Sequence, residues 1–420
     1  MDGTAVIEQL LTPEGRADPY PLYELARELG PVAPCGEGLV LVTGYQEADR
    51  ALRDPAFAVQ SAARQPGVVQ PLFPSPAREL FARSLLETDA PDHTRVRALI
   101  ASVFTARRVA ALAPAVAAAV ARLLEQLAGS GTDGSPVDFM DGFAFRLPVG
   151  VVCELLGVPE QDHYRFRGLA SDLTAALELE AEPAELDAAD AAAEELGDYF
   201  LELAARRVAD PRDDLVGALV QVAAADGARL GGDELIANLV VLLVAGFETT
   251  TNLLGNGLRL LFDHPELITR LRGGGLAPGA FTEEVLRFDP PVQLTTRIAR
   301  GDGLALGGVP VPPGTGVLLL LGAANRDPAR YPQPDRFDPD RFDPDRFDPA
   351  GSDRRGPAGR PLSFGAGAHF CLGARLARLE ADLALPALLT RFPALAPAAA
   401  PLRRERLVLR GYRSLPVSTV

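Results

Sequence analysis

The chain has 420 residues and carries 41 basic and 56 acidic side chains, which gives a formal net charge of −15 at pH 7. With 47% hydrophobic residues it can bury a large core, which excludes a disordered protein, and its acidic balance argues against a general nucleic-acid binder, which carries a basic face. No lysine occurs, so mechanisms that need a Schiff-base or phosphate-loop lysine are excluded as well.

The three cysteines, Cys35, Cys153 and Cys371, are far apart in the sequence and form no CxxC pair. A disulfide framework or a structural zinc site is therefore not expected, and a reducing cytoplasm fits this cysteine usage. No secretory signal pattern precedes Tyr20, and the most apolar stretch, around 239–247, is too short to span a bilayer. We expect a soluble, cytoplasmic protein that has neither a nucleic-acid nor a membrane partner.

In chain order, the hydrophobic pattern predicts an amphipathic helix at 19–30, a strand at 39–43 and a helix at 45–53. Residues 58–85 lack a regular period and contain several prolines, which predicts a long loop of the kind that often carries function. Helical spacing then returns in the segments 93–104, 107–128, 139–157 and 190–207.

The acidic, Ala-rich stretch 174–197 predicts a solvated helix face or a connector. One long helix follows at 232–262, and because its middle is apolar on most sides we expect it to be buried. A short helix at 283–288 is stopped by two consecutive prolines, short strands and turns fit 303–322, and a last helix covers 372–391.

The segment from Asp335 to Pro349 contains three tandem copies of Asp-Arg-Phe-Asp-Pro. This period is too short for a solenoid, so expansion of a surface loop is favoured over a functional module. No linker divides the chain elsewhere. We therefore expect residues 1–420 to form a single domain of mainly α class with a small β region.

The most informative segment is Phe364-Gly-Ala-Gly-Ala-His-Phe-Cys371-Leu-Gly373, which precedes a predicted helix. Its glycines let the backbone approach a flat cofactor closely, and the N–H groups at the helix start stabilise a thiolate at Cys371. A thiolate held in this way suits iron. A buried structural role is commoner for a lone cysteine, but the spacing Phe-Gly-x-Gly-x-His-x-Cys-x-Gly is specific enough to favour the ligand.

This segment resembles the haem-binding loop of the cytochromes P450, and the resemblance extends in the same order over nearly the whole chain. It implies that Cys371 is the axial iron ligand of haem b (iron protoporphyrin IX), with Phe364, Gly365, His369 and Gly373 beside the haem. It also implies a mainly α, triangular-prism fold in which the haem is buried between the long central helix and the Cys371 loop.

The long helix contains Ala245-Gly-Phe-Glu248-Thr249. Small residues at 245 and 246 leave room for a flat or diatomic group, and the Thr249 hydroxyl can bond back to the carbonyl of Ala245. An acid beside an alcohol can relay protons to a bound oxygen species, but a structural ion pair of Glu248 explains these residues equally well when they are taken alone. The resemblance implies that Thr249 steadies iron-bound oxygen and that Glu248 helps to deliver protons.

Glu284-Val-Leu-Arg287 places an acid and a base on one helix face. Most such pairs are surface ion pairs, whereas the resemblance implies a buried structural network that includes a third arginine. The repeat offers Arg336, Arg341 and Arg346 for this role. Counting forward from the upstream motif favours Arg336, and counting back from the haem loop favours Arg346. We expect Arg336.

His93 and Arg97 are four residues apart in a predicted helix and could together grip a carboxylate, although such pairs usually lie on a solvated face. The resemblance implies that both bind haem propionate groups, as do Arg297 and His369. No Gly-x-Ser-x-Gly elbow and no zinc-type histidine spacing supports another catalytic class.

The resemblance implies insertion of one oxygen atom from O2 into an organic substrate, with electrons supplied by a ferredoxin and an NAD(P)H-dependent ferredoxin reductase. Mostly apolar pocket residues favour a lipophilic or aromatic small molecule, and the composition is typical of bacterial specialised metabolism. The expected pocket residues are Val241, Val244, Val292, Leu294 and Thr295. The alternatives are oxidative coupling or ring formation without net oxygen insertion, a gas- or ligand-binding haem protein without turnover, and a haem-free helical binding protein in which Cys371 is structural.

Overall fold

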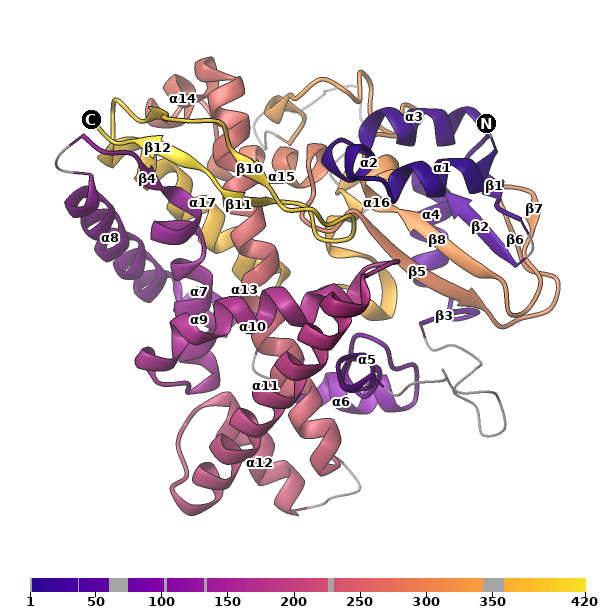
Figure 1. Cartoon of the computed structure of the whole chain (residues 1–420), viewed down its shortest axis with the longest axis horizontal. Coiled ribbons are helices and arrows are strands. Elements are labelled where there is room, and N and C mark those ends of the chain that lie inside the picture. The colour runs from indigo at the N-terminus through magenta and orange to yellow at the C-terminus, as the bar shows by residue number, and fades with distance from the viewer. Residues whose placement is uncertain are drawn as a thin grey trace.

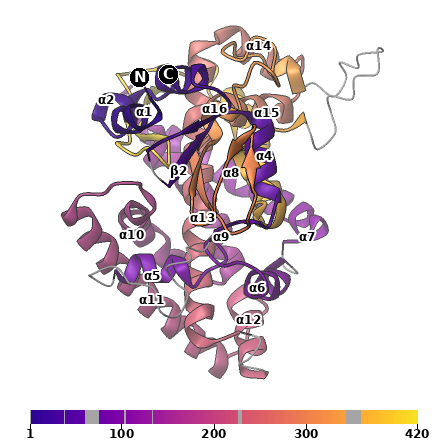
Figure 2. The ribbon, with the colours of Figure 1, turned by 90° about the vertical axis from the view of Figure 1, so that its right-hand side faces the viewer.

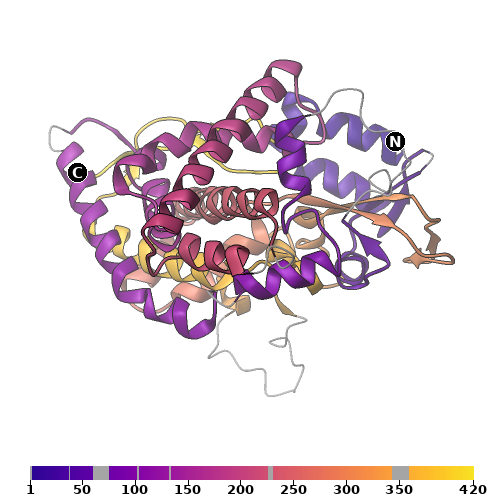
Figure 3. The ribbon, with the colours of Figure 1, turned by 90° about the horizontal axis from the view of Figure 1, so that it is seen from below.

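The computed structural model describes residues 2–36, 38–59, 75–101, 104–131, 134–225, 230–342 and 359–420. Figure 1 shows that helices make up most of the molecule, while the longer strands gather in one region next to the N-terminus. Seen from below in Figure 3, this strand region lies at the end that holds the N-terminus, opposite the end that holds the C-terminus. The expected mainly α class with a small β region is confirmed.

The helices follow one another along the chain with few long interruptions. The first eight are α1 (Gly3–Leu10), α2 (Pro13–Ala17), α3 (Tyr20–Glu28), α4 (Tyr45–Arg53), α5 (Pro76–Ala82), α6 (Asp92–Ala101), α7 (Ala106–Ala111) and α8 (Ala113–Ser130). The middle of the chain forms α9 (Arg146–Leu156), α10 (Phe166–Leu173), α11 (Pro183–Ala209), α12 (Leu215–Ala225), α13 (Gly232–Asp263), α14 (Pro265–Arg272) and α15 (Pro278–Phe288). The last two are α16 (Leu321–Ala324) and α17 (Ala374–Arg391).

Short helical turns connect several of these elements. One is the π-helix η2 (Met140–Ala144), and the others are the 3-10 turns η3 (Glu160–Arg165), η4 (Thr174–Leu177), η5 (Pro339–Phe342), η7 (Leu362–Phe364) and η8 (Gly367–His369). The helix expected at 139–157 is therefore two elements, η2 and α9. The acidic stretch 174–197 contains η4 and the first half of α11.

The largest sheet has the strand order β1-β2-β8-β5-β3, in which only the β2–β8 pair is parallel. Its strands are β1 (Val32–Pro34), β2 (Leu39–Val42), β8 (Gly316–Leu320), β5 (Leu294–Ala299) and β3 (Phe57–Ala58). Smaller sheets pair β4 (Val137–Asp138) and β9 (Ala396–Pro397) with β12 (Pro416–Ser418), β10 (Leu402–Arg403) with β11 (Tyr412–Ser414), and β6 (Ala305–Leu306) with β7 (Val309–Pro310).

Side-chain alternation gives the largest sheet two apolar faces. On β8, Val317 packs into a cluster with α4, whereas Leu318 packs into a different cluster with α1 and α3. Ala366, from the loop that carries Cys371, belongs to the cluster on the α4 face. Arg297 on β5 lies opposite Val317, and opposite residues of an antiparallel pair share a face, so Arg297 projects to the side where the Cys371 loop packs.

Helix α13 forms the centre of the helical part. It is 32 residues long and packs against α9, α11, α15 and α17, which buries most of its side chains. In Figure 2 it runs through the middle of the molecule, with α10 and α11 on one side and α6 and α7 on the other. By length and composition alone α13 could cross a membrane, but 61% of its most apolar window is buried, as in the core helix of a soluble protein.

The long loop expected at 58–85 is only partly a loop. Residues 60–74 lie outside the described residues, and α5 occupies Pro76–Ala82. Ser75 caps the N-terminus of α5, and the carboxylate of Asp190 on α11 accepts hydrogen bonds from Ser75 Oγ at 2.6 Å and Ala77 N at 3.0 Å. Because this anchor lies 115 residues away from Ser75, no local periodicity could reveal it.

The Glu284–Arg287 pair on α15 is buried, as expected. Both side chains have no exposed surface, and Arg287 Nε lies 2.7 Å from Glu284 Oε2. Arg287 also donates hydrogen bonds to the carbonyls of Asn325 at 3.2 Å, Pro334 at 2.7 Å and Arg336 at 3.0 Å. One guanidinium therefore holds two stretches of irregular backbone against α15.

The third member of this network is Arg341, and the choice of Arg336 was wrong. Arg336 contributes only its backbone carbonyl, and its side chain is exposed. The turn η5 brings the side chain of Arg341 back towards α15, so that Arg341 Nε lies 3.5 Å from Glu284 Oε1. Arg346 lies outside the described residues.

Replacing Arg341 by Ala should destabilise the protein more than replacing Arg336 by Ala. Arg341→Ala removes a charge from beside buried Glu284 and breaks hydrogen bonds to the carbonyls of Pro332 and Gln333, which should lower the free energy of unfolding by about 1–3 kcal/mol. Arg336→Ala is the matched control and should change it by no more than about 0.5 kcal/mol. Urea unfolding measures both, and equal losses would contradict the assignment.

Another buried acid, Glu380 on α17, has no counter-charge among the residues that the structure describes. Its side chain is 1% exposed, and Oε2 has no hydrogen-bond partner within the described ranges. Burial raises the pKa of this carboxyl well above its ordinary value of 4.5. Glu380 is therefore neutral in the folded protein at pH values where the unfolded chain ionises it, and the stability tied to its protonation is lost as the pH rises above 4.5.

Glu380→Gln should therefore stabilise the protein in a pH-dependent way. The amide stays neutral at every pH, so the variant should match the parent near pH 4.5 and exceed its free energy of unfolding at pH 8. Urea unfolding at the two pH values checks this, with Glu202→Gln at an exposed position of α11 as the control. The same shift at both pH values would show that Glu380 is not a neutral buried acid.

Candidate active site

The Cys371 loop, residues 364–373, is held in place by its own backbone and by α4. Cys371 N donates a hydrogen bond to Phe364 O at 2.9 Å. Gly367 has a φ of +67°, and a Cβ at this position would lie 2.4 Å from Leu52 O at the end of α4. Only glycine allows both this backbone conformation and this contact, so the loop delivers Cys371 to the start of α17 in a defined position.

The surroundings of Cys371 shift the pKa of its thiol in opposite directions. Burial raises the pKa of the thiol, while the N–H groups of Gly373 and Ala374 and the guanidinium groups of Arg378 and Arg97 act in the opposite direction. Cys371 is surrounded by protein but keeps an exposed surface, so the sulfur borders an open space instead of packing into the core. A metal ion bound to this sulfur would displace the proton and hold the thiolate.

One stripe of the otherwise buried helix α13 also borders open space. Between Ala237 and Leu258 every residue is buried except Ala245, which is exposed, and three half-buried residues, Leu242, Gly246 and Thr249. These four follow the i, i+3, i+4, i+7 spacing of one helix face. Ala245, in the middle of the stripe, is exposed at the centre of the molecule's core helix.

The hydrogen bond expected for Thr249 is present, whereas Gly246 has a different role from the one expected. Thr249 Oγ1 donates to Ala245 O at 3.2 Å. A Cβ on Gly246 would lie 2.6 Å from Val152 Cγ2, so this glycine permits α13 to pack against α9. Of the two small residues, Ala245 is thus the one that leaves room beside the helix.

Glu248 is paired with a residue that the motifs did not reveal. Its side chain is 7% exposed, and its carboxylate accepts a hydrogen bond from Arg404 Nη1. Arg404 follows β10 near the C-terminus and also donates from Nη2 to Ser171 Oγ on α10 at 3.1 Å. Glu248 therefore takes part in an ion pair, and Arg404 belongs to the site although it is 156 residues away in sequence.

The four residues predicted to bind propionate groups gather into one cluster, here called the cationic cluster because the guanidinium groups of two of them carry positive charge: His93, Arg97, Arg297 and His369. The rings of His93 and His369 are 4.1 Å apart, and Arg97 donates to Phe370 O at 2.6 Å. Burial, together with the neighbouring His93 and Arg297, lowers the pKa of His369 to about 4. Burial also lowers the pKa of Arg297 to about 10.

This cationic cluster is short of negative charge. Asp89 is the nearby acid, with Oδ1 4.0 Å from His369 Nε2. His93 is 2% exposed, and its Nε2 has no hydrogen-bond partner in the part of the chain that the structure describes. Buried cationic groups and an orphaned ring nitrogen are what a ligand with carboxylate groups would satisfy.

The expected pocket residues separate into two groups. Thr295 shares the face of β5 that carries Arg297. Val241 and Val244 are next to the stripe of α13 in sequence, but their side chains are buried in the apolar cluster of α9, α10 and α11. Leu294 was wrongly placed in the pocket. It lies on the opposite face of β5, 3% exposed, and packs with the cluster of α1 and α3, because side chains alternate along a strand.

Val292, just before β5, is half-buried and forms an isolated β-bridge with Leu409.

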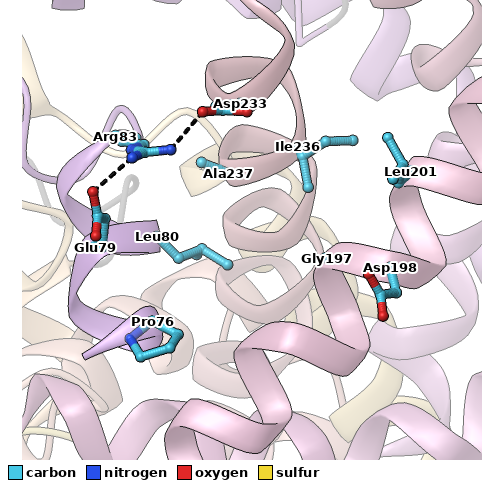
Figure 4. A pocket seen from close by; sticks show the side chains of 10 residues that line it. All are labelled: Pro76, Glu79, Leu80, Arg83, Gly197, Asp198, Leu201, Asp233, Ile236 and Ala237. Atoms are coloured by element: carbon cyan, nitrogen blue, oxygen red, sulfur yellow. Dashed lines mark hydrogen bonds and ion pairs between the residues drawn. The ribbon is translucent and has the colours of Figure 1, made fainter. Parts of the chain in front are cut away.

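A separate surface groove of about 480 Å³ lies between α5, α11 and the N-terminus of α13. Figure 4 shows Arg83 reaching from α5 to Glu79 and to Asp233, while Leu80 and Ile236 project into the groove. The stretch 58–85, expected to carry function, reaches this groove through α5, but none of the other expected site residues lines it.

Comparison with known proteins identifies the family. The Cytochrome P450 family model matches residues 279–410, and a 6-deoxyerythronolide B hydroxylase of Saccharopolyspora erythraea is 40% identical over 95% of this chain and 96% of the relative. The chain is a cytochrome P450. A vitamin D(3) 25-hydroxylase of Pseudonocardia autotrophica is 37% identical over 96% of this chain and 94% of the relative. The crystal structure of Mycobacterium smegmatis CYP164A2 in the ligand-free state matches with a TM-score of 0.85 at 38% identity, covering 99% and 100% of the two chains.

Membership of the family makes this P450 a monooxygenase that uses haem iron, and the triangular P450 fold is confirmed. The residues present fit a haem. Cys371 offers a soft sulfur donor at the start of a helix, which suits iron. Gly365 has a φ of +67° and carries no Cβ, so the loop backbone can approach a flat cofactor closely. The buried cationic cluster matches the carboxylate groups that a haem carries on one edge.

If the cluster binds the haem propionates, Arg297→Gln should release haem faster than the parent P450. The change removes one buried positive charge, so haem transfer from the ferric protein to excess apomyoglobin should accelerate about tenfold, as for the loss of one charge-assisted hydrogen bond. Arg413→Gln on exposed β11 is the control and should transfer haem at the parent rate. Equal rates for the two variants would remove Arg297 from the haem site.

Proposed function

We propose that this P450 inserts one oxygen atom from O2 into a lipophilic or aromatic small molecule, by hydroxylation or related tailoring in bacterial specialised metabolism. The observation that carries the proposal is the Cys371 loop, which presents a single accessible sulfur at the start of α17. The two named relatives, hydroxylases of 6-deoxyerythronolide B and of vitamin D(3), support a lipophilic substrate.

The cofactor in this proposal is haem b, held between α13 and the Cys371 loop. Cys371 would hold the haem iron through its sulfur, Phe364, Gly365 and Gly373 would contact the haem from the loop, and Ala245 and Thr249 would line it from α13. His93, Arg97, Arg297 and His369 hold the propionate groups. When bound, the haem supplies the iron centre at which dioxygen is activated.

Glu248 and Thr249 are the proposed catalytic residues. Thr249 Oγ1 already donates to Ala245 O at 3.2 Å, so the oxygen lone pairs stay available to accept a proton-bearing partner on the open side of the helix. Glu248 is next in sequence and carries a carboxylate, a group that can accept a proton and pass it on. This chain thereby positions a hydroxyl and an acid beside the same stripe of α13.

The electrons in this proposal come from NAD(P)H through a ferredoxin reductase and a ferredoxin. We place residues 1–420 in one domain and the protein in the cytoplasm, where a reducing environment suits three cysteines that form no disulfide.

The reduced, CO-bound difference spectrum tests the proposal. The purified protein should show the strongly red-shifted Soret band of thiolate-ligated haem, and Cys371→Ala should abolish it because no other donor takes the place of the sulfur. Cys153→Ala is the control, since Cys153 is buried in the α9 core, and it should keep the band. A parent spectrum typical of imidazole-ligated haem, or no Soret band at all, would overturn the proposed function.

A further inference from the structure

The segment Arg404–Arg410, here called the C-terminal segment, links β10 to β11. Hydrogen bonds and an ion pair attach it to α11 and to the connection that precedes α11. Glu178 accepts hydrogen bonds from Leu407 N at 2.9 Å and from Val408 N at 3.1 Å. Arg406 forms an ion pair with Glu185 at 2.6 Å. The connection between α10 and α11 thus holds the backbone that carries Arg404 (Figure 1).

Arg404 makes the single described ion pair of Glu248, the proposed proton-relay acid. The two side chains are 13% and 7% exposed, so the pair is largely shielded from solvent. Arginine stays protonated and holds its donors in a rigid plane, so it fixes the direction of a carboxylate that it contacts. Ser171 Oγ accepts a second hydrogen bond from Arg404 at 3.1 Å and fixes the guanidinium in turn.

We propose that Arg404 is a positioning residue for proton delivery: it holds the Glu248 carboxylate beside the Thr249 stripe of α13, and the C-terminal segment holds Arg404. The inference rests on the proposed function, because it gives Arg404 a role only through Glu248. Arg404 itself touches neither substrate nor the reacting atoms. A carboxylate on a long side chain has several rotamers, and the ion pair selects one of them.

In the absence of organic substrate, the share of dioxygen that is reduced to hydrogen peroxide instead of water reports on proton delivery. Dioxygen that takes up two electrons and two protons leaves as hydrogen peroxide, and dioxygen that takes up four electrons and four protons leaves as two water molecules. The quantity to measure is hydrogen peroxide released per NADPH consumed, with purified holoenzyme and a surrogate ferredoxin and ferredoxin reductase.

Arg404→Gln should raise the peroxide fraction about twofold or more, because Glu248 loses the group that orients it. Arg404→Lys keeps the charge without the planar fork and should lie between the parent and Arg404→Gln, and it serves alone if the Gln variant does not fold. Arg406→Gln is the matched control, since it loosens one fastening of the same segment without removing the partner of Glu248, and its peroxide fraction should rise less than that of Arg404→Gln.

A double-mutant cycle separates positioning from general loosening of the structure. If Arg404 acts through Glu248, Arg404→Gln should add nothing to the peroxide fraction of Glu248→Gln. Equal effects of the Arg404 and Arg406 variants, or an undiminished effect of Arg404→Gln in the Glu248→Gln background, would overturn the inference. Failure of the proposed function is distinguishable, because the parent protein would then lack the thiolate spectrum before any turnover is measured, and both proposals would fall.

Discussion

The haem side of the molecule depends on the buried ion pair between Glu284 and Arg287. Arg287 bonds the carbonyl of Asn325, and the Asn325 side chain accepts from Leu362 N at 2.7 Å and donates to Ser363 Oγ at 2.9 Å, directly before the Cys371 loop. A buried ion pair adds little net stability compared with apolar residues of the same volume. Its contribution here is to give irregular backbone around 325–342 a defined path, so that the loop that follows has a fixed base.

The cationic cluster, in contrast, lowers the stability of the fold in the absence of a negatively charged ligand. Burying Arg297 lowers the pKa of its guanidinium, and burying His369 beside His93 keeps both rings neutral at neutral pH, so the fold is strained electrostatically where the proposed haem carboxylates bind. A ligand that supplies negative charge there relieves this strain. Haem binding and folding are therefore thermodynamically linked, and the holoprotein should be the more stable form.

Helix α13 serves as a core element and as one wall of the site at the same time. Its apolar faces bury against neighbouring helices, with Gly246 permitting close approach to Val152, while a single stripe around Ala245 and Thr249 stays open. Because the helix cannot move without disturbing the core, the groups on that stripe are held rigidly. Glu248 sits at the edge of the stripe, and its orientation depends on Arg404 from the far end of the chain.

The sequence by itself determined three features: the presence of the Cys371 loop, the length and burial of α13, and the hydrogen bond of Thr249. Each depends on contiguous residues or on helical period, so the local backbone decides it. The tertiary structure alone decided that Arg341 completes the Glu284 network, that Leu294 faces away from the site, that Asp190 anchors α5 and that Arg404 pairs with Glu248. These contacts depend on how an irregular turn or a strand face is oriented, or join residues more than 100 positions apart, and only packing of the whole chain fixes such distances and directions.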